Sequence, residues 1–205
     1  MKRFLFIIIA LLVPTALIIA QESTTFSIGP RVGINFSTFT NTDEADFKPG
    51  LNAGITSTYS INERTGITFD ALYSQEGNQY DANATTVKTN LDYIRLMLAF
   101  DVFFGDLGER FRPKLYFGPT LGFLINAETE IRNQETDIMD NFKNTDFGLA
   151  AGLGFNYRVG SKQWLNVDAR FQPGLTDIVE NKPSGEDAVR NQTIQLSVGI
   201  AFGLY

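Results

Sequence analysis

The sequence predicts an all-β fold, an eight-stranded antiparallel up-and-down transmembrane β-barrel, on three observations. Eight segments alternate apolar and polar residues with a period of two. The connections between these segments alternate between short and long, and an export signal precedes the first segment. An even number of strands and loops sorted by length are typical of closed bacterial outer-membrane barrels.

The N-terminus has the order of a secretory signal. Lys2 and Arg3 form a basic start, an apolar run follows from Phe4 to Ala20, and polar residues begin at Gln21. The alternative is an uncleaved membrane anchor, but the run is short for a bilayer span and Pro14 interrupts it. We therefore expect a signal peptide at residues 1–20 and an outer-membrane barrel domain at residues 21–205.

The eight strands follow from strict alternation. Between Thr25 and Ser37, Phe26, Ile28 and Val32 lie at alternate positions from Ser27, Gly29 and Gly33. A strand with this pattern has one apolar and one polar face. The same pattern predicts strands at 25–37, 50–61, 67–76, 93–104, 114–123, 147–158, 165–172 and 193–204.

The connections predict an orientation. Short turns lie at 62–65, 105–112 and 160–162, whereas long polar loops lie at 38–48, 77–88, 126–145 and 176–191. In an up-and-down barrel, every short turn then falls at one rim and every long loop at the other. Outer-membrane barrels have short periplasmic turns and long extracellular loops. We therefore expect the protein in the outer membrane, with both termini periplasmic and the long loops extracellular.

The polar face is expected to line the lumen. Ten strand glycines lie on this face, where they make room for long neighbours in a narrow barrel. Charged residues of both signs share the face, which predicts a structural lumenal charge network of Arg31, Asp70, Arg95, Asp101, Lys114, Arg158, Asp168 and Arg170. The apolar face then contacts lipid, where a midplane Arg or Lys costs about 2–4 kcal/mol.

Composition excludes several kinds of chemistry. The chain has no histidine and no cysteine, so Ser-His-Asp and Cys-His catalysis, histidine-ligated metals, lipid anchoring through cysteine and disulfides are all excluded. Without Lys2 and Arg3, 15 basic residues face 23 acidic ones, a net charge of −8. An acidic chain without a basic stripe argues against nucleic acid as a partner.

The remaining candidates for catalysis are carboxylates and one lysine. Asp70, Asp101 and Asp168, or an activated Lys114, could act as general bases. Salt-bridge partners that fill the lumen are the stronger interpretation of the same residues. The acidic loop at 126–145 matches no calcium-binding motif, and the Gly-rich segment at 148–154 lacks phosphate-loop spacing. We therefore expect no catalytic, cofactor-binding or metal-binding residues.

The last strand ends in a pattern that resembles the C-terminal insertion signal of bacterial barrels. Polar and small residues alternate with apolar ones up to a terminal aromatic residue. The residues that carry this signal are Ser197, Gly199, Phe202, Leu204 and Tyr205. The resemblance implies recognition by the barrel-assembly machinery of the cell envelope.

Four segments extend the resemblance to a family. They are Tyr93-Ile94-Arg95-Leu96-Met97-Leu98, Tyr116-Phe117-Gly118-Pro119, the run from Phe147 to Phe155, and Arg170-Phe171-Gln172-Pro173-Gly174-Leu175-Thr176-Asp177-Ile178. These segments resemble the PorT-like outer-membrane β-barrel family of Bacteroidetes, eight-stranded barrels like OmpX and OmpA. Family members often have Glu and Pro where this chain has Arg95 and Met97, so no role transfers to those positions. The resemblance implies fold and location in a Gram-negative envelope, and it leaves activity open.

The functional expectation is a small non-enzymatic outer-membrane barrel. It would act as an envelope scaffold or through its surface loops, as a monomer in outer-membrane lipid, with an envelope or secretion-system protein as partner. Two alternatives remain open at this stage. One is a soluble periplasmic lipocalin-like binding barrel with its apolar face inside, and the other is a carboxylate-dependent membrane hydrolase.

Overall fold

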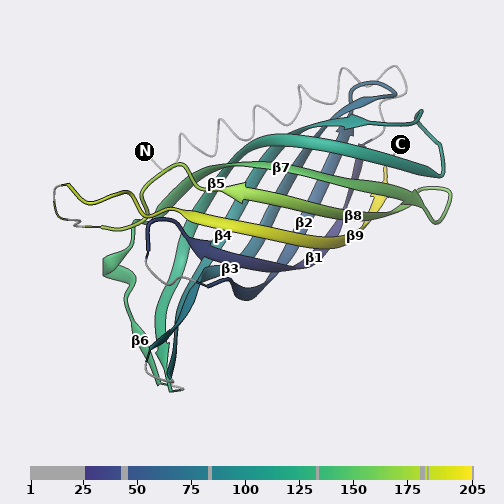
Figure 1. The fold of residues 1–205 in the computed structure, drawn as a ribbon. Helices are drawn as coiled ribbons and strands as arrows, with labels where there is room; N and C mark the ends of the chain where they lie inside the picture. Colours follow the sequence, from purple (N-terminus) through teal and green to yellow (C-terminus); the bar gives the residue numbers. More distant parts are fainter. Residues whose placement is uncertain are drawn as a thin grey trace, which may run out of the picture.

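A computed structural model describes residues 26–42, 46–82, 85–132, 134–180, 183 and 185–204. Figure 1 shows their chain as a tilted barrel of long antiparallel strands. The predicted signal peptide at residues 1–20 and the terminal Tyr205 lie outside the described residues. Within the described part, no helix is long and apolar enough to cross a bilayer.

Eight strands close into a ring. Strands β1 to β5 pair antiparallel in chain order, and so do β7 to β9. β5 also pairs with β7, and β1 pairs with β9 to close the ring. The short β6 lies outside the ring and pairs only with the end of β5. The strands are β1 (Phe26–Phe39), β2 (Lys48–Ser60), β3 (Thr65–Ala82), β4 (Thr85–Phe103), β5 (Phe111–Ile131), β6 (Gln134–Asp137), β7 (Thr145–Arg158), β8 (Gln163–Pro173) and β9 (Asn191–Gly203). The predicted eight-stranded barrel is confirmed.

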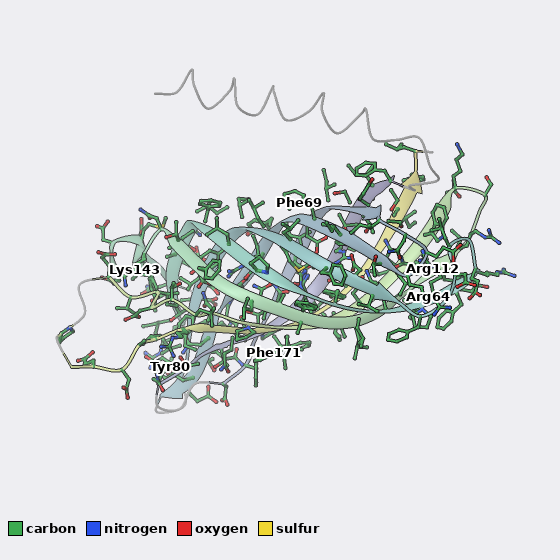
Figure 2. The ribbon with its side chains drawn as sticks, turned by 90° about the horizontal axis from the view of Figure 1, so that it is seen from above. Arg64, Phe69, Tyr80, Arg112, Lys143 and Phe171 are labelled. Atoms are coloured by element: carbon green, nitrogen blue, oxygen red, sulfur yellow. The ribbon has the colours of Figure 1, made fainter. Side chains whose placement is uncertain are left out.

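Each strand directs alternate side chains inward and outward. In β9, Thr193, Gln195 and Ser197 are buried in the barrel, whereas the intervening apolar side chains are exposed on its outer surface. Phe69 and Phe171 extend from the outside of the wall in Figure 2. The apolar face therefore points outward, which contradicts the lipocalin-like alternative, because such a barrel keeps its apolar face inside.

The two ends of the barrel differ. The short-turn end carries the connections at 61–64, 104–110 and 159–162, together with Phe26 and Leu204. There the Leu204 amide donates to the Phe26 carbonyl at 2.9 Å. The long-loop end carries the other connections. Figure 2 shows Arg64 and Arg112 at the first end and Tyr80 and Lys143 at the second.

Two of the four predicted long loops are wrong in part. Residues 77–82 and 85–88 continue β3 and β4, and the loop predicted at 126–145 contains the end of β5, β6 and a 3-10 helix, η1 (Met139–Asn141). These strand ends project beyond the barrel at the lower left of Figure 1. Their residues are polar on both faces, so the apolar alternation that marks a membrane strand is missing.

An apolar cap closes the lumen near the long-loop end. It consists of Phe39, Leu91, Tyr93, Leu124, Ala127 and Ile178, with Ile138, Met139, Phe142, Val179 and Val189 packed against it. The loop after β8 is fixed across the mouth because the Ile178 amide donates to the Val189 carbonyl at 2.9 Å and the Ile178 carbonyl accepts from Lys143 at 2.8 Å. This loop therefore contributes core and is not simply a solvated connection.

The closed ring makes the barrel resistant to detergent. Each of the eight strands of the ring is paired on both sides, so partial opening would expose backbone groups that have no partner in an apolar phase. We expect the folded protein to migrate as a compact band in SDS without heating and to shift to its full apparent mass after boiling. Electrophoresis of paired samples measures this. A protein that runs identically in both lanes and is recovered without detergent would contradict the lipid-facing barrel.

Candidate functional site: the filled lumen

One ion-pair cluster lies in the half of the lumen nearer the short-turn end. The guanidinium of Arg31 bridges two strands by pairing with Asp70 at 3.0 Å and with Asp168 at 2.8 Å. Arg170 adds a second cation to Asp70 at 2.9 Å, and Lys114 a second to Asp168 at 3.0 Å. We call these five residues the lower cluster. They come from four strands, β1, β3, β5 and β8, and all are buried.

A second cluster lies nearer the apolar cap. Arg95 of β4 pairs with Glu76 of β3 through two nitrogen atoms, at 3.1 Å and 2.5 Å, and with Asp146 of β7 at 2.9 Å. The Asn191 amide also donates to Asp146, at 2.9 Å, and Lys48 donates to the Glu76 carbonyl at 3.0 Å. These five residues form the upper cluster. Charged hydrogen bonds of this kind are the stronger class in proteins.

Neutral side chains join the two clusters. From Glu76 the hydrogen bonds run through Ser74 and Asn35 to Asn52, at 2.9, 2.9 and 2.8 Å. From Arg170 they run through Gln195 to Ser197, at 2.7 and 2.8 Å. Ser197 donates to Asn52 at 3.5 Å, which joins the two paths. The lumen is therefore filled by one connected polar network.

Glycine makes room for the largest of these side chains. A Cβ atom on Gly122 would lie 2.8 Å from Nη1 of Arg95 and 2.9 Å from its Cζ. A Cβ atom on Gly152 would lie 2.5 Å from Cζ of the Tyr116 ring, which also points into the lumen. The polar-face glycines at these two positions are thus required by the packing of the lumen.

The structure distributes the eight sequence-predicted lumenal residues unequally. Arg31, Asp70, Lys114, Asp168 and Arg170 come together in the lower cluster, while Arg95 lies in the upper one. Asp101 is fully buried near Lys114 and Thr68 but forms no ion pair among the described residues, since Lys114 pairs with Asp168.

One expectation about this face needs correction. Arg158 is exposed at the short-turn end of β7 and takes no part in either cluster, because the strand leaves the lumen there. Asp70 and Arg95 belong to different clusters and do not pair with each other. In the register of β3 and β4, Arg95 lies opposite Leu72, and Asp70 lies opposite Met97. Trp164 of β8 lines the lumen mouth at the short-turn end.

Sequence reasoning missed three charged residues of the upper cluster, Lys48, Glu76 and Asp146. All three lie at the margins of the expected strands or in the expected loops. Extending the period-two pattern by one step would have found Asp146, because it shares the parity of Gly148 and Gly152 on β7. Lys48 could have been found in the same way, because it lies an even number of residues from Asn52 on the inward face of β2.

The C-terminal pattern divides between the two faces of β9. Ser197 and Gly199 face inward, whereas Phe202 and Leu204 are exposed on the outer surface. An outward apolar face at the end of the last strand is the geometry that an insertion signal would present, but recognition by the assembly machinery stays a prediction.

The charges inside the barrel balance, with one exception. Five buried bases face five buried acids among the described residues: Arg31, Lys48, Arg95, Lys114 and Arg170 against Asp70, Glu76, Asp101, Asp146 and Asp168. The sixth buried base is Arg112, close to the short-turn end of β5. Buried charges are costly unless they are paired, so the balance accounts for both signs in one lumen.

The arrangement offers little access for chemistry. Asp70, Asp101 and Asp168 are buried among other side chains, and a general base must lie within hydrogen-bond reach of its substrate. In the described ranges, no group of three or more acidic residues has the geometry to hold a metal ion.

Comparisons with known proteins agree with this geometry. Neisserial surface protein A has a TM-score of 0.51 and 19% identity, covering 86% of this chain and 96% of that chain. OprG from Pseudomonas aeruginosa has a TM-score of 0.52 and 14% identity, covering 89% and 96%. Outer Membrane Protein W of E. coli has a TM-score of 0.52 and 13% identity, covering 90% and 100%. At these identities the likeness concerns the fold.

A search of curated protein sequences found no match. The sequence does match a family of outer-membrane barrels over residues 19–180, most of the chain. With the closed ring and the outward apolar face, this match identifies the chain as a member of the outer membrane protein beta-barrel domain family.

Proposed function

We propose that the protein is a non-enzymatic outer-membrane barrel that acts at its long-loop end, as an envelope scaffold or by binding a partner there. In this proposal the long-loop end is extracellular, both termini are periplasmic, and the protein is a monomer in outer-membrane lipid. The observation that carries the proposal is the filled lumen. A barrel whose interior is occupied by its own side chains must act through its surface.

Two layers support a closed interior. The upper cluster crosses the lumen from β3 through β4 to β7, and the apolar cap covers it on the side of the long loops. An eight-stranded barrel is just wide enough for side chains to fill, whereas aqueous pores need about 16 strands. Passage of solutes is therefore not part of the proposed function.

The projecting sheet supports action at the long-loop end. The ends of β3, β4 and β5 extend past the apolar band, and β6 adds a fully exposed edge (Figure 1). In the β5–β6 hairpin, Glu128 lies opposite Asp137 and Glu130 lies opposite Glu135. Like charges directly opposite each other destabilise a hairpin, so this surface is better suited to meeting a partner than to supporting the fold.

The resemblance to PorT-like barrels of Bacteroidetes supports a finer version of the proposal. In that version the partner is another envelope or secretion-system protein. The burial of Asp70, Asp101 and Asp168 favours this non-enzymatic function over the carboxylate-dependent hydrolase.

Asp70 provides a test of the structural role of the lumenal carboxylates. In Asp70→Ala, Arg31 and Arg170 each lose the partner at 3.0 and 2.9 Å, so we expect the free energy of unfolding to fall by about 3–5 kcal/mol. Urea unfolding of the detergent-folded protein, followed by the heat-dependent SDS shift, measures this. Asp106→Ala is the matched control, because its pair with Arg64 is exposed and should contribute about 1 kcal/mol or less. Equal stability of the two variants would contradict a structural role for Asp70.

The orientation can be tested with single cysteines, because the natural chain has none. We expect Glu135→Cys, on the exposed β6, to react with a membrane-impermeant maleimide on intact cells. Ser161→Cys, in the turn between β7 and β8, should react only after the outer membrane is permeabilised. The reverse pattern would show that the long-loop end faces the periplasm and would overturn the proposed site of action.

The filled lumen predicts the absence of a steady pore. In planar bilayers the wild-type protein should give no stable open-channel current under conditions in which a 16-stranded porin does. A reproducible ohmic conductance would mean that the network and the cap move aside, and action through the surface alone would be refuted.

A further inference from the structure

We propose that the mouth of the lumen at the short-turn end is a binding site for a small ligand that joins one carboxylate to an apolar ring. The site is a cavity of about 270 Å³. Its walls include Ser27, Phe103, Arg112, Asn156, Trp164 and Asn166. It lies at the opposite end of the barrel from the proposed site of action, so it is an additional function.

Arg112 is the anchor of this site. It is only 4% exposed and forms no ion pair among the described residues. Its Nη2 donates to the Glu63 carbonyl at 2.6 Å, while its Nε is buried without a hydrogen-bond partner. The ion pairs of the lumen join Arg31, Arg95, Lys114 and Arg170 to Asp70, Glu76, Asp146 and Asp168, and Arg112 takes part in none of them. A buried guanidinium with free donors suits a carboxylate, which can accept two parallel hydrogen bonds from it.

The acids nearest Arg112 lie outside the cavity on the turn between β4 and β5. Asp106 pairs with Arg64 at 3.4 Å, and Glu109 is exposed. Figure 2 shows Arg64 and Arg112 at the same end of the barrel. Neither acid lines the cavity or forms an ion pair with Arg112, so the donors of its guanidinium are not taken up by an acid among the described residues.

The rest of the wall is half polar and half aromatic. The Oδ1 atoms of Asn156 and Asn166 are buried without hydrogen-bond partners, and Asn166 is 4% exposed. Phe103 already packs against the guanidinium, with its ring centroid 4.2 Å from Cζ of Arg112. Trp164 offers a second aromatic surface. Cavities of about 300–1,000 Å³ hold drug-sized ligands, so this one fits a compound of about one ring.

Benzoate is the probe, and Trp164 is the reporter because it is the only tryptophan in the chain. We expect benzoate to change the Trp164 fluorescence of the detergent-folded protein in a saturable way. Benzamide has the same shape without the charge and should give no saturable change. Inorganic phosphate, which has charge but no ring, should compete weakly.

Variants separate binding from partition into detergent. Arg112→Gln should weaken benzoate binding about tenfold or more, because a charged hydrogen bond is lost. Arg110→Gln is the matched control, since it removes the same charge from an exposed side chain and should bind as wild type. Ser27→Phe fills the cavity while keeping Arg112, so it should abolish the signal even if Arg112→Gln fails to show the heat-dependent SDS shift of a folded barrel.

The outcomes are decisive in both directions. Saturable binding of benzoate that depends on Arg112 and Ser27 but not on Arg110 supports the site. The proposal is overturned if the wild-type protein gives no saturable response, if benzamide binds as well as benzoate, or if Ser27→Phe binds normally. Phosphate that competes as strongly as benzoate would overturn the ring as part of the ligand.

Discussion

The rest of the structure depends on one constraint, the pairing of every backbone hydrogen-bonding group inside an apolar phase. A sheet meets it only by closing, and here β1 pairs with β9 to complete the ring. Closure with eight strands leaves a lumen about as wide as two facing side chains. Because residues alternate between the faces, a lipid-facing apolar half fixes a polar half inside, and those polar side chains must satisfy one another.

The lumen meets that requirement by balancing charge and by varying side-chain size. Asp70 and Asp168 each accept two cations, and Arg95 donates to two acids, so no single pair stands alone. The guanidinium of Arg95 needs space that a Cβ atom on Gly122 would occupy. The charged residues and the glycines of the polar face therefore belong together, because the glycines leave the space that the long side chains fill.

The membrane-spanning part of the fold could be predicted from the sequence because lipid imposes a simple rule on alternate residues. Beyond the lipid, alternate residues need not be apolar, so the alternation no longer marks a strand. Residues 77–82 of β3 are polar on both faces, and only backbone pairing with β4 makes them a strand.

The same limit applies to the site. Parity places Arg95 inside, but its pairing with Glu76 and Asp146 depends on the register of three strands and the direction of one side chain across the lumen. The apolar cap was missed because Ile178 lies in a segment whose apolar and polar residues do not alternate.

The two ends of the barrel obey different physical requirements, which argues that they serve different purposes. At the long-loop end, apolar residues from distant loops are brought together over the network, and this excludes water from Arg95 and its acids. At the short-turn end, Leu107 and Gly108 of the turn between β4 and β5 reach the mouth but do not fill it, and Arg112 and Asn166 border a cavity with polar atoms that have no hydrogen-bond partner. A stable plug needs no base beyond the five that balance the five buried acids in number. Arg112 is a sixth buried base that forms no ion pair among the described residues, and burying an unpaired cation is unfavourable for folding by itself. The carboxylate ligand that we propose at this mouth would give Arg112 an anionic partner inside the cavity.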